Sequence, residues 1–126
     1  MSDDGAVVTV LMTAPGMEVA EAVVRGLLDE RLVACGNVLP GAVSLYRWEG
    51  EVRRDEEAVV VLKTLRRLVP RVLERAGTLH PYEVPEVLVQ EVADGAPAYL
   101  AWVGTECEGR SGDGEAPGSG RPAVKR

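Results

Sequence analysis

Residues 42–64 read AVSLYRWEGEVRRDEEAVVVLKT, two extended runs joined by a turn. From Ala42 to Glu49 the side chains alternate between two faces, as in a β-strand, and Gly50 can supply the positive φ angle that a tight hairpin turn needs. The return run, Ala58–Thr64, is apolar on both faces until Lys63. A strand with one solvated face would alternate polar and apolar residues. Both faces are therefore expected to be covered, and because a second subunit is the natural cover, the pattern predicts an oligomer.

The segments that flank this hairpin supply the other elements of a small mixed domain. A short β-branched run at 6–12 is typical of a buried strand. Apolar residues between Ala20 and Leu28 recur with the period of an amphipathic helix. Pro70 is tolerated only in a first helical turn, so the second helix is predicted to begin near Leu68 and to close at Gly77. The predicted elements are a strand over 6–12, a helix through 18–28, the hairpin with a bend at Pro40-Gly41, a helix over 68–77, a strand over 85–92 and a short helix over 97–103.

This order predicts an α+β fold of the ferredoxin-like type, a split βαβ sandwich with the order βαββαβ plus a short C-terminal helix. In such a fold one antiparallel sheet carries two helices on one face. We assign residues 6–103 to this domain and residues 1–5 to a flexible N-terminus. Residues 104–126 hold six of the 14 glycines and almost no large apolar side chain, so they are predicted to form a disordered tail.

The bulk composition argues against several classes of partner. A net charge of −6 is unfavourable for binding a nucleic-acid backbone, which requires a basic face. No apolar stretch approaches the ~18 residues of a membrane span, and no secretory leader precedes the first strand. We therefore expect a cytoplasmic protein that binds neither nucleic acid nor membrane. Cys35 and Cys107 make a weak case for a disulfide, because Cys107 falls in the predicted tail.

Five short blocks carry a resemblance to a known family. They are RLVAC (31–35), YRWEG (46–50), LKT (62–64), HPYEVPE (80–86) and YLAW (99–102), in this order. Together they resemble the CutA family, named for tolerance to divalent cations, over most of the body from Val7 to Val103. The resemblance implies a homotrimer whose long hairpins join sheets across subunit boundaries. It also implies a link to copper and other divalent cations, with no established enzyme reaction.

His80, the only histidine, is the first candidate metal ligand. Imidazole is the commonest protein ligand for copper, zinc and nickel, and Pro81 favours an extended, rigid backbone at the histidine. A second interpretation is equally open, in which His80 is a hydrogen-bonded packing residue. One histidine is far from a complete site, but three subunits would bring three imidazoles.

At a subunit boundary, Met12, Glu83 and Glu86 are candidates to complete a metal site around His80. The resemblance also reveals a departure, because some family members carry a cysteine at the position of Met12 and a second histidine at that of Leu79. This sequence has neither, which weakens the case for copper.

The remaining candidates each have a bland and a functional interpretation. Cys35 is either a small buried hydrophobe, or a thiolate ligand or redox-sensitive thiol. Lys63 is expected to pair with Glu86 or Glu49, and the alternative is that it faces an anionic ligand in a cleft. Four of the five aromatic residues are predicted to line that cleft, with packing at an interface as the alternative. These four are Tyr46, Trp48, Tyr82 and Trp102.

No phosphate-binding glycine loop is present, so catalysis is not expected. The predicted function is that of a cytoplasmic, non-enzymatic homotrimer that binds divalent cations, with copper as one candidate, at a boundary cleft holding His80. The alternative is a signalling or scaffold trimer that binds a small metabolite or a partner protein. That alternative is based on the resemblance between trimers of this family and the PII signalling proteins, which concerns the fold alone.

Overall fold

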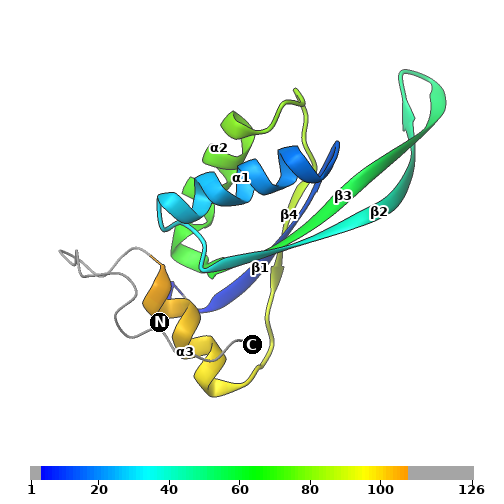
Figure 1. Cartoon of the computed structure of the whole chain (residues 1–126). Helices are drawn as coiled ribbons and strands as arrows, with labels where there is room; N and C mark the ends of the chain where they lie inside the picture. The colour runs from blue at the N-terminus through cyan, green and yellow to red at the C-terminus, as the bar shows by residue number, and fades with distance from the viewer. Residues whose placement is uncertain (1–3, 108–126) are drawn as a thin grey trace.

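The computed structural model describes residues 4–107, which form one four-stranded antiparallel sheet and three α-helices (Figure 1). The strands lie in the order β2-β3-β1-β4. The α+β ferredoxin-like prediction is confirmed, and α1 and α2 cover one face of the sheet. The elements are β1 (Val7–Ala14), α1 (Met17–Asp29), β2 (Cys35–Trp48), β3 (Glu51–Leu65), a single 3-10 turn (Arg66–Leu68), α2 (Val69–Leu79), β4 (Val87–Glu91) and α3 (Pro97–Glu106).

The core lies between the sheet and the helices α1 and α2. Every second residue of β1 is fully buried, from Val8 to Ala14, because successive side chains of a strand point to opposite faces. Gly36 of β2 lies where α1 packs closely on the sheet. A Cβ atom there would lie 2.9 Å from side-chain atoms of both Leu62 and Val24, so only glycine fits without movement of its neighbours.

The hairpin of β2 and β3 is much longer than the rest of the sheet. Its strands pair from Cys35↔Lys63 to Trp48↔Glu51, whereas β1 pairs with β3 only between Ala58 and Leu65. The outer part of the hairpin therefore reaches well past the helices (Figure 1). Both turn residues have positive φ, 52° at Glu49 and 84° at Gly50, as expected of a two-residue hairpin turn. The predicted bend at Pro40-Gly41 is confirmed by a register shift between Leu39 and Ala42.

Large apolar side chains remain exposed on the hairpin and on the sheet face opposite the two helices. Leu45 and Val52 on the outer hairpin are 68% and 66% exposed, and Leu88 on β4 is 55% exposed. Val59 and Val61 of β3 are only half-buried, although their neighbours Val60 and Leu62 are fully buried. A single chain therefore leaves exposed the apolar hairpin surface that was expected, from its sequence, to be covered by a second subunit.

Two predicted boundaries need correction. The second helix does not close at Gly77, which keeps a helical conformation, and it ends at Leu79 because His80 before Pro81 is extended. The tail does not begin at Gly104, since α3 continues to Glu106 and Cys107 is buried against the core. Val103 and Cys107 lie one helical turn apart and both pack into the core. The low apolar content of the segment after Val103 did not predict this contact.

The chain ends lie mostly outside the described residues. Of the N-terminal segment 1–5 only Asp4 and Gly5 are described, and the carbonyl of Asp4 accepts a hydrogen bond from the backbone N–H of Arg67 at 3.0 Å. The tail prediction for 108–126 also falls outside them. None of the helices between residues 4 and 107 is long and apolar enough to cross a membrane.

Candidate functional site

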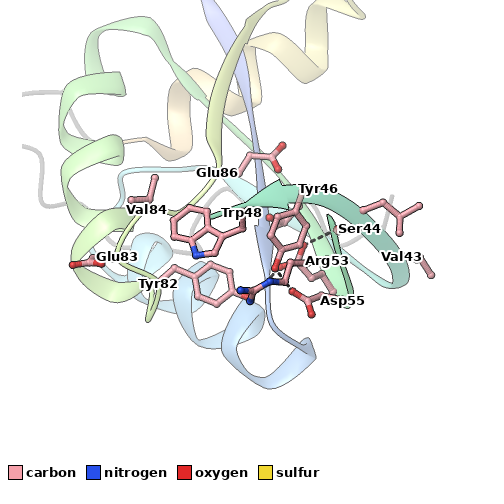
Figure 2. Close-up of a pocket in the computed structure, with 13 residues that line it drawn as sticks. Val43, Ser44, Tyr46, Trp48, Arg53, Asp55, Tyr82, Glu83, Val84 and Glu86 are labelled. Carbon is pink, nitrogen blue, oxygen red and sulfur yellow. Dashed lines mark hydrogen bonds between the residues drawn. The ribbon is translucent and has the colours of Figure 1, made fainter. Parts of the chain in front are cut away.

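A pocket of about 730 Å³ lies between the outer hairpin and the segment that connects α2 to β4. Figure 2 shows its lining residues, which come from the outer parts of β2 and β3, from the connecting segment and, with Thr13, from the end of β1. This volume is within the range typical of small-molecule sites. Tyr46, Trp48 and Tyr82 gather around the same space (Figure 2), so three of the four aromatic residues predicted to line a cleft do so.

Glu57 is the most buried acid of the pocket, at 9% exposure. One carboxylate oxygen accepts a hydrogen bond from Ser44 Oγ at 2.7 Å, and the other accepts one from Tyr82 Oη at 3.0 Å. Burial, together with the hydrogen bond to Glu57, raises the pKa of Tyr82 to about 12. Tyr82 therefore remains a hydrogen-bond donor at neutral pH, and it ties the connecting segment to β3.

A second hydroxyl–carboxylate pair lies across the hairpin, where Tyr46 donates a hydrogen bond to Asp55. This bond is the main reason that the pKa of Tyr46 is raised. Arg53 stands directly opposite Tyr46 in the strand register and is the one cationic side chain of the lining. Four acids line the same pocket, so its net charge is negative and favours cations. They are Asp55, Glu57, Glu83 and Glu86.

His80 is 5% exposed and has both ring nitrogens occupied. Nε2 donates to the carbonyl oxygen of Thr13 at 2.8 Å, and Nδ1 accepts from the backbone N–H of Tyr82 at 3.1 Å. Its ring also packs against that of Tyr82, with the centroids 4.8 Å apart. A metal ion would have to displace one of these bonds. The geometry thus fits the packing interpretation, in which His80 holds Tyr82 in place.

The other predicted metal ligands are dispersed. Met12 is fully buried in the core, and Cys35 Sγ lies 3.3 Å from Tyr99 Oη, near α3. Glu83 and Glu86 are exposed and line the pocket together. Over residues 4–107 no group of three or more His, Cys, Asp or Glu side chains is arranged to hold a metal ion.

Two predicted cleft residues lie outside this pocket. Lys63 bonds neither Glu86 nor Glu49, because its ammonium group donates to Asn37 on the adjacent strand. Trp102 packs on α3 beside Tyr99, with ring centroids 5.6 Å apart.

Eight of the lining residues were missed from the sequence, among them Ser44, Arg53, Asp55 and Glu57. The signal that could have found them is the hairpin register. A two-residue turn at 49–50 places Tyr46 opposite Arg53 and Ser44 opposite Asp55. Glu57 then follows on the same face of β3.

Comparison with known proteins agrees with this fold. The model of the CutA1 divalent ion tolerance protein family matches residues 8–106. The divalent-cation tolerance protein CutA of Thermus thermophilus is 45% identical over 94 residues, which are 75% of this chain and 91% of that protein. Protein CutA of the mouse is 38% identical over 89% of this chain, which spans only 63% of the mouse protein. The crystal structure of CutA from Xylella fastidiosa has a TM-score of 0.79 at 40% identity, covering 85% of this chain and all of that one.

The family match covers the sheet, the helices and every block that carried the resemblance, from the first strand to α3. The chain therefore belongs to the CutA1 divalent ion tolerance protein family.

Proposed function

We propose that this chain acts as a cytoplasmic, non-enzymatic homotrimer that binds divalent cations, copper among them, in metal-ion tolerance. The observation that carries the proposal is the acidic pocket beside an uncovered apolar hairpin. The family's link to divalent-ion tolerance supports the ligand class.

The trimer is supported by the apolar surface that one chain leaves exposed. Leu45 and Val52 lie on the part of the hairpin that pairs with no third strand among residues 4–107. Burying such side chains gains about 25 cal/mol per Å² of apolar surface, which favours docking onto another copy. The pocket is lined by this same part of the hairpin, so docked hairpins would bring further side chains close to it.

Among the predicted metal ligands, those that line the pocket offer carboxylate oxygens as ligand atoms. His80, Met12 and Cys35 do not fit a shared copper centre within one chain, because their side chains are buried or hydrogen-bonded in different places. Glu83 and Glu86 are exposed carboxylates, and such groups suit divalent cations that prefer oxygen ligands. These two acids would hold a cation, and adjacent copies would contribute the remaining ligands.

Titration calorimetry with Cu²⁺ and Mn²⁺ tests this assignment. We expect Glu83→Gln/Glu86→Gln to lose most of the binding, whereas His80→Gln retains it. The matched control is Glu49→Gln/Glu51→Gln, which removes two charges at the hairpin turn outside the pocket lining. The opposite result, in which His80→Gln loses binding and the double glutamine variant retains it, would contradict this assignment and identify His80 as the metal ligand.

A second candidate function is supported by the size of the pocket and its aromatic lining. A space of about 730 Å³ is far larger than one metal ion needs, and three aromatic rings offer no ligand atoms for a hard cation. A trimer that binds a small metabolite there, as in the signalling alternative, would use both features. A thermal-shift screen of nucleotides, organic acids and amines distinguishes the two, since a melting shift with a metabolite but not with metals favours the second.

A further inference from the structure

The charge on Glu57 has no cationic partner in the part of the chain that the structure describes. Its two oxygens accept hydrogen bonds only from neutral hydroxyls, those of Ser44 and Tyr82. No lysine or arginine from Asp4 to Cys107 lies within ion-pair distance of it. Arg53 lines the same pocket but acts electrostatically on Tyr46, its partner across the strands. An unpaired carboxylate at 9% exposure is costly unless a cation approaches it.

The rings around this carboxylate are suited to one class of cation. Tyr46, Trp48 and Tyr82 are each partly exposed and surround the pocket space (Figure 2). The faces of aromatic rings attract cations, and a desolvated organic ammonium gains most from them. Val84 adds apolar surface to the walls, which fits carbon substituents on the ligand and not a hydrated metal ion.

We propose that this pocket binds a small organic ammonium ion, with the charge facing Glu57 and the carbon substituents against the aromatic rings. Ser44 and Tyr82 position the carboxylate, and His80 positions Tyr82 through its backbone. The inference deepens the small-metabolite candidate above and does not depend on metal binding.

The test uses the full-length protein and three ammonium probes, which are tetramethylammonium, choline and 1,4-diaminobutane. Calorimetry reports binding, and so does tryptophan fluorescence, in which the contribution of Trp48 is separated from that of Trp102 by the Trp48→Leu variant. The neutral control is 3,3-dimethylbutan-1-ol, which has the shape of choline without its charge. We expect the ammonium probes to bind and the neutral alcohol to bind at least about tenfold more weakly.

Two substitutions locate the site. Glu57→Gln keeps groups that can bond Ser44 and Tyr82 but removes the charge, and should weaken ammonium binding at least about tenfold. Trp48→Leu, at an exposed position, should weaken it about threefold or more. Glu49→Gln removes an equal charge outside the pocket lining and should leave affinity within about twofold. Melting curves of each variant check folding.

Three results would overturn the inference: no binding of any ammonium probe at ~10 mM, equal binding of the neutral alcohol, or unchanged affinity in both Glu57→Gln and Trp48→Leu. If metal titrations fail while choline still binds, the metal proposal alone is lost. If metals bind and the ammonium probes do not, this inference alone is lost.

Discussion

Replacing His80 with alanine should destabilise the fold and release the pocket's connecting segment. The substitution removes two hydrogen bonds, to the Thr13 carbonyl and from the Tyr82 backbone N–H, and deletes a ring that is 95% buried. Each lost bond costs about 1 kcal/mol net, and the lost ring packing adds about 1–2 kcal/mol. We expect the free energy of unfolding to fall by about 3–4 kcal/mol in total.

The assay is denaturant unfolding of wild type, His80→Ala and two variants that each restore one bond. In His80→Asn the side-chain oxygen can replace Nδ1 as acceptor for Tyr82, and in His80→Gln the amide can replace Nε2 as donor to Thr13. Each should recover about 1 kcal/mol of the loss. A double-mutant cycle with Tyr82→Phe should show coupling of at least about 0.5 kcal/mol, because Tyr82 reaches Glu57 only from this backbone position. A loss below about 1 kcal/mol in His80→Ala, without coupling, would refute the positioning role.

Three further predictions concern packing, pH and thiol chemistry. Gly36→Ala should cost about 1–3 kcal/mol, because its Cβ would meet Leu62 and Val24 at 2.9 Å. Its control, Gly104→Ala, has open space and lies in α3, so it should be neutral or stabilising by up to about 1 kcal/mol, and a loss there would contradict the helical assignment. The pKa of Tyr82 is raised from 10.0 to about 12, so the protonated hydroxyl stabilises the fold below pH 10 and this contribution is lost as the pH rises toward 12. Tyr82 is 38% exposed, which reduces the effect to about 1 kcal/mol, and Tyr82→Phe should show a smaller loss than wild type as the pH rises from about 10 to about 12. Burial raises the pKa of Cys107 to about 11, so a thiol reagent near neutral pH should modify the half-buried Cys35 first, and equal rates for both would contradict the buried placement.

The sequence predicted most of the fold because the strong patterns are local. The alternation of β2, the stripe of α1 and the turn at Glu49-Gly50 each depend on neighbouring residues, and the structure confirms all three. The errors lie where tertiary contacts override local composition. Gly77 reads as a helix end yet remains helical, and Cys107 stands beside a glycine-rich tail yet packs into the core.

The site was less predictable, because its members meet only through the hairpin register. Tyr46, Trp48 and Tyr82 were identified from their scarcity, but Glu57 looks in the sequence like one of three consecutive surface acids. Its burial depends on Ser44 across the hairpin and on Tyr82 from a distant segment. A metal ligand needs a free ring nitrogen, whereas a packing histidine has both ring nitrogens hydrogen-bonded. The positions of Thr13 and Tyr82, which the sequence does not give, decide between these two roles for His80.

The most direct test of the account is the mass of the assembly in solution, since the proposed trimer would cover the exposed apolar hairpin with partner copies. Sedimentation equilibrium of the full chain at micromolar concentration should return about three times the 13.5 kDa of one chain. A mass near 13.5 kDa would contradict the claim that the apolar hairpin is covered by other copies of the chain.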